Sequence, residues 1–192
     1  MCIKKIPCVF GVLKTEKGMI IKDNILSYLN ERCDVLCIEQ EPPGILFEYP
    51  ALKYTLKMAI DLNCPVLYLH TKGAVDPNHS WYQEYVRKLW KVEFGTDKIF
   101  ESYNKIISET PKIICPIAGK DGRQTWWNGF IINPAAAKEL TKTFHYDRNR
   151  YYYEEMCKYA PSIELISSAV EGCYNEKETN ILLKQIVDNY NV

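Results

Sequence analysis

The sequence has no excess of charge of either sign and no apolar run long enough for a membrane span. Its 192 residues contain 24 basic and 24 acidic side chains, so no overall field attracts nucleic acid or anionic lipid. The first 13 residues include Lys4, Lys5 and Pro7, and their apolar run is too short for a signal sequence. We therefore expect a cytoplasmic protein with no transmembrane segment and no nucleic acid partner.

The sequence also lacks the motifs that identify many common enzymes. It contains no Walker A, GxGxxG, HExxH, nucleophile-elbow or EF-hand pattern. It has no CxxC pair, and its eight dispersed cysteines are typical of reduced, buried thiols rather than of disulfides or a zinc site. A cysteine-dependent hydrolase is one interpretation, with His70 paired to Cys64 or Cys115. Both thiols look buried and inert, which weakens it.

The length suits a single domain covering residues 1–192, which can bury a large core without a disulfide staple. Apolar runs typical of strands alternate with segments in which apolar residues recur at helical spacing. The predicted strands are 7–13, 34–39, 65–69, 112–116 and 125–133. The predicted helices are 19–30, 49–62, 80–95, one that follows Thr96, one capped by Asn133 and one that begins at Asn175. The predicted class is α/β, with a mostly parallel central sheet flanked by helices.

The segment 66–69 is a short apolar run, typical of a strand that is buried on both faces. It leads directly into His70, Thr71, Lys72 and Gly73. Ligands of open α/β sheets bind beyond the carboxyl ends of the strands. An ammonium and a backbone N–H both bind phosphate well, so Lys72 and Gly73 form either a phosphate site or a solvated turn. His70 is either an acid–base group or a hydrogen-bonded core histidine.

Two aromatic segments are further candidates. Neighbouring strand side chains alternate, so one indole of Trp126 and Trp127 is expected to point outward, beside Asn128, where it could stack on a sugar. The alternative is a pair of core aromatics. Glu154 follows three tyrosines and would act as a general base if it faced a cleft, or is a solvated carboxylate. Arg123 lies in a charged loop, which on its own is typical of a solvated surface.

Together these segments resemble a family of bacterial glycosyltransferase-like proteins with a nucleotide-diphospho-sugar transferase (GT-A-type) fold, found in polysaccharide-synthesis loci. Members have a strand ending in Tyr-x-His-Thr/Ser-Lys-Gly, a Trp-containing helix, a Trp-Trp strand and a late aromatic-rich Glu motif. The similar parts of this chain are 39–42, 47–50, 68–73, Trp81 with Trp90, 126–127 and 150–154. The likeness covers roughly residues 34–157.

The resemblance implies a GT-A-like, Rossmann-related fold and the transfer of a sugar from a nucleotide-diphosphate donor to a saccharide acceptor. It also implies surface-polysaccharide synthesis and a peripheral association with a synthesis complex. The implied catalytic residues are His70 and Glu154, and the implied donor-binding residues are Thr71, Lys72, Gly73 and Arg123. The implied acceptor-binding residues are Trp126, Trp127 and Asn128.

The chain departs from the family pattern at two points. It has Gln124 and Thr125 where members have a Gly-Asn-aromatic step, and it lacks the Asp-x-Asp that clamps a metal and a diphosphate. No residue is therefore assigned to Mn²⁺ or Mg²⁺, and a need for either ion stays open. Two interpretations also stay open: an active transferase, and a catalytically silent sugar- or nucleotide-binding module that partners one.

Overall fold

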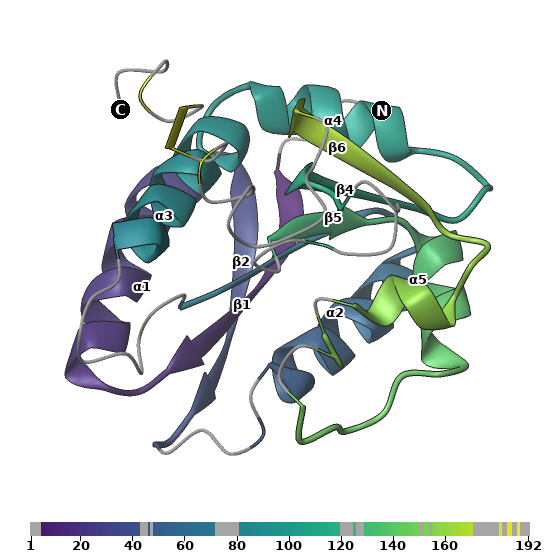
Figure 1. Cartoon of the computed structure of the whole chain (residues 1–192), viewed down its shortest axis with the longest axis horizontal. Helices are drawn as coiled ribbons and strands as arrows, with labels where there is room; N and C mark the ends of the chain where they lie inside the picture. The colour runs from purple at the N-terminus through teal and green to yellow at the C-terminus, as the bar shows by residue number, and fades with distance from the viewer. Residues whose placement is uncertain are drawn as a thin grey trace.

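The computed structural model describes residues 5–42, 46, 48–71, 81–119, 125, 129–149, 152–153, 155–170, 181, 184–185 and 188. Strands and helices alternate through its first half (Figure 1). The strands are β1 (Ile6–Leu13), β2 (Cys33–Gln40), β3 (Val66–His70), β4 (Lys112–Ile117), β5 (Phe130–Ile132) and β6 (Glu164–Val170). The helices are α1 (Glu16–Leu29), α2 (Tyr49–Leu62), α3 (Trp81–Phe94), α4 (Lys98–Ile106), α5 (Pro134–Thr141) and the 3-10 helix η3 (Met156–Tyr159).

The strands form one six-stranded sheet in the order β2-β1-β3-β5-β4-β6. β1 runs parallel to β2 and β3, and β4 runs parallel to β6. β5 is antiparallel to both of its neighbours, β3 and β4. The predicted α/β class, with a mostly parallel central sheet flanked by helices, is confirmed.

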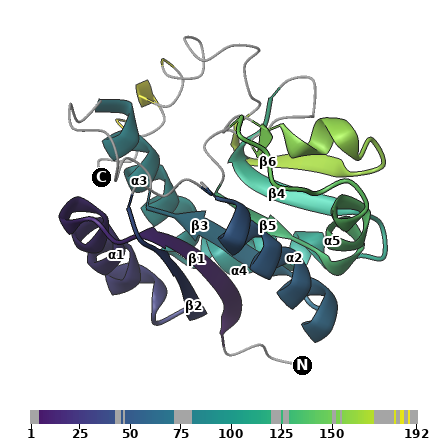
Figure 2. The ribbon, with the colours of Figure 1, turned by 90° about the horizontal axis from the view of Figure 1, so that it is seen from below.

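Two groups of helices cover the two faces of the sheet. Because side chains alternate along a strand, Phe10 of β1 packs with α1, α3 and α4, whereas Val9 packs with α2 and α5. In β3, Leu69 lies on the first face and Tyr68 on the second. Figures 1 and 2 show α1 with α3 on one side and α2 with α5 on the other. Burial on both faces explains why β1 and β3 have nearly continuous apolar sequences.

The structure differs from the predicted elements mainly in the second half of the chain. β6 was not predicted, because its sequence mixes polar and apolar residues and most of its side chains are half-buried at the edge of the sheet. β5 covers only part of the predicted strand 125–133, and Thr125 forms an isolated antiparallel bridge with Ala118. The predicted last helix lies mostly outside the described residues, although the described positions 181, 184, 185 and 188 are helical.

Asn133 is the predicted cap of α5, and this prediction is confirmed. Its Oδ1 accepts hydrogen bonds from the backbone N–H of Ala136 at 2.8 Å and of Lys112 at 3.1 Å. The sequence did not predict a second set of contacts made by this fully buried side chain. Its Nδ2 lies 2.7–3.2 Å from the carbonyl oxygens of Ile106, Ser108 and Thr110. One amide therefore ties the start of α5 to the connection between α4 and β4.

None of the helices in the described part of the chain combines the length and apolar character that a bilayer crossing requires. Six of the cysteines lie among the described residues, and all six are free thiols. Cys8, Cys33, Cys115 and Cys157 are buried, as predicted, and Cys37 and Cys64 are half-buried.

Candidate functional site

The carboxyl ends of β1 and β3 meet at one edge of the sheet. Gly11 of β1 is in register with His70 of β3. One residue further on, the Thr71 N–H donates to the Gly11 carbonyl oxygen at 2.9 Å, and Thr71 Oγ1 accepts from the Leu13 N–H at 3.1 Å. Thr71 is buried, and its two hydrogen bonds join the carboxyl ends of β1 and β3. Sequence reasoning missed this structural role.

Gly11 lets the chain pack closely at this edge, because a larger side chain would be crowded there. A Cβ at this position would lie 3.0 Å from the Ala51 Cβ of α2 and 3.5 Å from the His70 Cβ. The first separation is tighter than most real Cβ contacts, so glycine lets the end of β1 lie close against the first turn of α2. This close approach brings the residue before α2, Glu48, to the same edge.

Glu48 makes contacts with two side chains of β3. His70 Nε2 lies 3.5 Å from Glu48 Oε1, and the Tyr68 hydroxyl donates to Glu48 Oε2 at 3.5 Å. The side chains of His70 and Glu48 are only 13% and 19% exposed. We call Glu48, Tyr68 and His70 the edge cluster. Sequence reasoning did not single out Glu48, although the segment 47–50 was among those resembling the glycosyltransferase-like family.

The electrostatics of the edge cluster keep Tyr68 protonated. Burial raises the pKa of Tyr68 well above its usual value, and the nearby Glu48 charge and its hydrogen bond raise that pKa further. A phenol that stays neutral remains a hydrogen-bond donor. Tyr68 can therefore hold the Glu48 carboxylate at any physiological pH.

Aromatic rings surround the imidazole of His70. The Tyr68 ring stacks near it with centroids 6.0 Å apart, and the buried Trp90 of α3 meets it edge-on at 5.6 Å. Trp90 also touches the backbone before β5. A Cβ on Gly129 would lie 2.3 Å from the Trp90 Nε1, so only glycine fits there. His70, Trp90 and Gly129 thus bring β3, α3 and the start of β5 together.

The direction of β5 extends this edge. Phe130, the first residue of β5, is in antiparallel register with Tyr68, and their ring centroids are 5.3 Å apart. The chain therefore enters β5 from the side of the sheet at which His70 lies. The bridge between Ala118 and Thr125 follows the carboxyl end of β4, which is parallel to β3 because both are antiparallel to β5. The ends of β1, β3 and β4 and the beginning of β5 share one edge.

The tyrosines of the late motif lie next to the same edge. Burial is the main cause that raises the pKa of Tyr153 to about 12, and the Glu48 charge contributes to the rise. Both Tyr152 and Tyr153 belong to the core formed with α2, Tyr68 and Phe130. The described part of the Tyr-Tyr-Tyr-Glu motif is therefore close to the edge cluster in space, although it is about 80 residues away in sequence.

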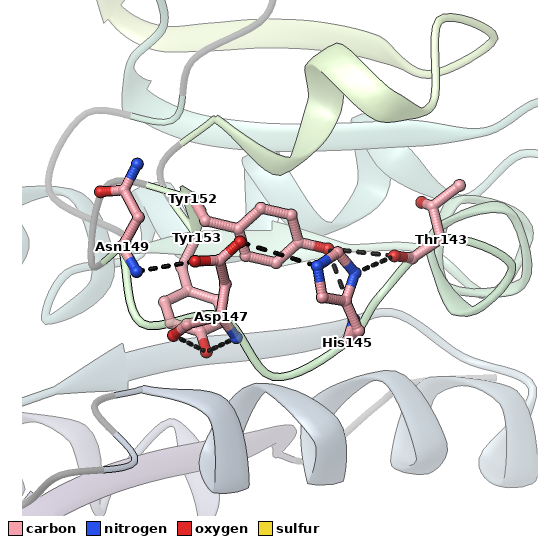
Figure 3. Close-up of polar contacts among 6 residues, drawn as sticks. All are labelled: Thr143, His145, Asp147, Asn149, Tyr152 and Tyr153. Carbon is pink, nitrogen blue, oxygen red and sulfur yellow. Dashed lines mark hydrogen bonds and ion pairs between the residues drawn. The ribbon is translucent and has the colours of Figure 1, made fainter.

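Tyr152 and Tyr153 also hold the loop 143–149, as Figure 3 shows. The Tyr152 hydroxyl donates to the Thr143 carbonyl oxygen at 3.1 Å, and the Tyr153 hydroxyl donates to the Asp147 carbonyl oxygen at 3.2 Å. In this loop His145 Nε2 lies 3.6 Å from Asp147 Oδ2. We call His145, Asp147 and Tyr152 the loop cluster.

The loop also contacts the start of α2. The Phe144 ring stacks on Tyr49 with centroids 5.3 Å apart and an angle of 11° between the planes. Tyr49 directly follows Glu48 in the sequence. The loop thus leads from the tyrosine motif to the residue beside the edge cluster.

Of the nine predicted site residues, the structure describes two, His70 and Thr71, and it brings both to the carboxyl edge. The other seven lie outside the described residues: Lys72, Gly73, Arg123, Trp126, Trp127, Asn128 and Glu154. The described residues next to them, Thr71, Thr125, Gly129 and Tyr153, lie at or beside this edge. Glu155, which follows Glu154 in the sequence, makes an ion pair with Lys158 at 2.8 Å.

The geometry argues against a cysteine-dependent hydrolase. Cys64 precedes β3 and His70 ends it, so the two are roughly 20 Å apart at about 3.3 Å per residue. Cys115 lies in β4, which β5 separates from β3. Burial raises the pKa of both thiols, which disfavours the reactive thiolate. The interpretation as a hydrolase in which His70 pairs with Cys64 or Cys115 is therefore wrong.

Comparisons with known proteins add nothing to this geometry, because no family model, curated protein or solved structure matches the chain. Within the residues that the structure describes, no group of three His, Cys, Asp or Glu side chains is placed to hold a metal ion. The edge cluster itself offers a carboxylate, an imidazole and a phenol that contact one another. Such a set can orient hydroxyl groups by hydrogen bonding.

Proposed function

We propose that this chain transfers a sugar from a nucleotide-diphosphate donor to an acceptor hydroxyl, on a GT-A-like, Rossmann-related fold. The observation that supports this proposal most is the convergence at one sheet edge of segments from three motifs. His70 ends β3, Gly129 precedes β5, and Tyr153 lies within electrostatic range of Glu48. His70 and Tyr153 belong to motifs that resemble the glycosyltransferase-like family, and Gly129 closely follows the Trp126-Trp127 pair.

The proposed donor site lies beyond the end of β3, where ligands of α/β sheets bind. The bond between the sugar anomeric carbon and the diphosphate oxygen breaks, and the diphosphate leaves with its negative charge. Lys72 and Arg123 offset that charge, and the Gly73 backbone N–H and the Thr71 hydroxyl donate to phosphate oxygens. His70, at the carboxyl end of β3, forms part of this donor site.

On the acceptor side, the oxygen of the acceptor hydroxyl forms the new bond to the anomeric carbon. Glu154 accepts the proton that this hydroxyl loses. Trp126 and Trp127 stack on the acceptor saccharide, and Asn128 hydrogen-bonds to it. The product is a longer saccharide, as surface-polysaccharide synthesis requires, and a peripheral association with a synthesis complex would supply the acceptor.

The proposal is tested by titrating the protein with a panel of nucleotide-sugars, with and without Mn²⁺ or Mg²⁺, and by measuring the release of nucleotide diphosphate. We expect one donor to bind and to release nucleotide diphosphate when a saccharide acceptor is added. Lys72→Ala should abolish the release, whereas Lys57→Ala, a change to an exposed lysine of α2, should not affect it. Binding of no donor under any condition would contradict the proposal.

The second candidate is a catalytically silent sugar- or nucleotide-binding module that partners an active transferase. The absence of an Asp-x-Asp from the sequence favours it. The same experiment separates the two functions, because a module binds a nucleotide-sugar but releases no nucleotide diphosphate with any acceptor.

A further inference from the structure

We infer that Glu48 binds the sugar of the donor through hydroxyl groups, and that His70 and Tyr68 are positioning residues that hold its carboxylate. This inference rests on the proposed function and adds a residue that neither the sequence motifs nor the resemblance assigned to the site.

The first step is that Glu48 does not use its side chain as helix-capping residues commonly do. Glu48 is the N-cap residue of α2, where a side-chain oxygen usually accepts from a backbone N–H of the first turn. No such bond forms here. The carboxylate points instead toward β3, where Oε1 faces His70 Nε2 and Oε2 accepts from the Tyr68 hydroxyl.

The second step concerns which group of the edge cluster faces a ligand. His70 directs Nε2 at Glu48 and its ring lies between Tyr68 and Trp90, so the imidazole is oriented toward the protein. Tyr68 is completely buried. Glu48 precedes α2 and retains more exposure than His70, at 19% against 13%. Of the three, Glu48 is the group best placed to meet a ligand at the edge.

The third step is chemical. Moving a carboxylate out of water costs free energy unless donors compensate its charge. The Tyr68 hydroxyl, the His70 imidazole and the positive end of the α2 dipole supply that compensation. A carboxylate accepts up to about four hydrogen bonds, so one group can be oriented by protein donors and accept from sugar hydroxyls at once. Vicinal hydroxyls match two carboxylate oxygens.

The described titratable groups near Glu48 include His70 and Tyr68 of β3 and, at longer range, Tyr153 of the late motif. All three carry a hydrogen-bond donor, and none is a carboxylate. His70 and Tyr68 can therefore donate to the Glu48 carboxylate, and a carboxylate also accepts hydrogen bonds from hydroxyl groups.

The test compares two affinities for each variant, one for the nucleotide-sugar that the wild type binds and one for the corresponding nucleotide diphosphate without sugar. Glu48→Gln keeps the size of the side chain but removes its charge. We expect affinity for the nucleotide-sugar to fall about 10- to 100-fold, the range for hydrogen bonds to a charged group. Affinity for the nucleotide diphosphate should change less than about threefold, because the phosphates do not contact Glu48.

Two further variants keep this test interpretable. Tyr68→Phe preserves ring packing but removes one donor to the carboxylate, so it should lower affinity for the nucleotide-sugar by a smaller factor than Glu48→Gln. Glu139→Gln removes a comparable charge from a surface ion pair on α5 and should change neither affinity. Thermal unfolding of each variant checks that it is folded, and a misfolded Glu48→Gln leaves Tyr68→Phe as the deciding variant.

Each outcome has a defined meaning. A selective loss of nucleotide-sugar affinity in Glu48→Gln supports the inference. An equal loss of both affinities, or no loss of either, overturns the role of Glu48 while the proposed function stands. Failure of the wild type to bind any nucleotide-sugar overturns the proposed function and this inference together.

Discussion

The edge cluster and the loop cluster contain the same three kinds of side chain but use them differently. Each has a histidine, a carboxylate and a tyrosine hydroxyl in mutual contact. In the edge cluster the contacts join side chains from β3 and from the start of α2. In the loop cluster the residues lie within ten positions of one another, and the hydroxyl of Tyr152 bonds to backbone groups at both Thr143 and His145.

Burial sharpens this contrast. The side chains of His145 and Asp147 are 62% and 34% exposed, against 13% and 19% for His70 and Glu48. An exposed ion pair contributes little to stability, while tyrosine hydroxyls that bond to backbone groups hold a loop in one conformation. A half-buried carboxylate such as Glu48, which contacts the side chains of His70 and Tyr68, has a larger desolvation cost and gives less structural benefit. The comparison separates a loop cluster that serves the fold from an edge cluster for which we propose a ligand.

Asn133 is a polar residue that serves the fold, because its side-chain hydrogen bonds described above all join it to backbone atoms. Replacing it by alanine leaves several buried backbone groups without their partner. We expect Asn133→Ala to lower the free energy of unfolding by about 3–5 kcal/mol. Urea denaturation measures this loss. Asn104→Ala, a change to an exposed residue of α4, should lower it by less than about 0.5 kcal/mol, and equal losses would contradict the account.

The two histidines should differ in their effect on activity. His70→Ala removes the group that holds Glu48 at the edge, and we expect the release of nucleotide diphosphate to slow about 100-fold, the cost of a misplaced group. His145→Ala should slow it less than about threefold, because His145 is exposed in the loop. Single-turnover kinetics on both variants measures the difference. Similar losses in the two variants would remove the functional distinction between the clusters.

For stability the order of the two clusters should be reversed. The hydroxyl of Tyr152 in the loop cluster should contribute more than the hydroxyl of Tyr68 in the edge cluster. Tyr152→Phe removes bonds to two backbone groups and should lower the free energy of unfolding by about 1–2 kcal/mol. Tyr68→Phe removes one long bond to a carboxylate and should lower it by less than about 1 kcal/mol. Urea denaturation of both variants decides the order. A larger loss in Tyr68→Phe would mean that the edge cluster is mainly structural.

The smallest expected effect concerns Tyr153. Burial raises the pKa of its hydroxyl to about 12. In the unfolded chain a tyrosine titrates near pH 10, so the folded state holds this proton more tightly. Tyr153 therefore contributes stability below pH 10 that is lost as the pH rises through about 12. The stability of Tyr153→Phe should fall less steeply than that of the wild type between pH 10 and 12. Tyr159→Phe, a change to an exposed tyrosine, should follow the wild type.

Local sequence signals predicted much of this fold but not its edge cluster. The apolar runs of β1 and β3 and the cap at Asn133 depend on neighbouring residues, so their patterns were sufficient. β6 was missed because an edge strand with half-buried, partly polar side chains has no apolar run. Glu48 was not chosen because its contacts with Tyr68 and His70 depend on how α2 packs against β3 at Gly11 and Ala51. No periodic pattern signals such a contact.

The structure of the chain with a bound nucleotide diphosphate, uridine or guanosine, tests the central claim most directly. The account predicts that the phosphates bind beyond the carboxyl ends of β1 and β3, next to Thr71, at a place from which an attached sugar would reach Glu48. A nucleotide diphosphate bound on another surface, such as the loop cluster around His145, would contradict it.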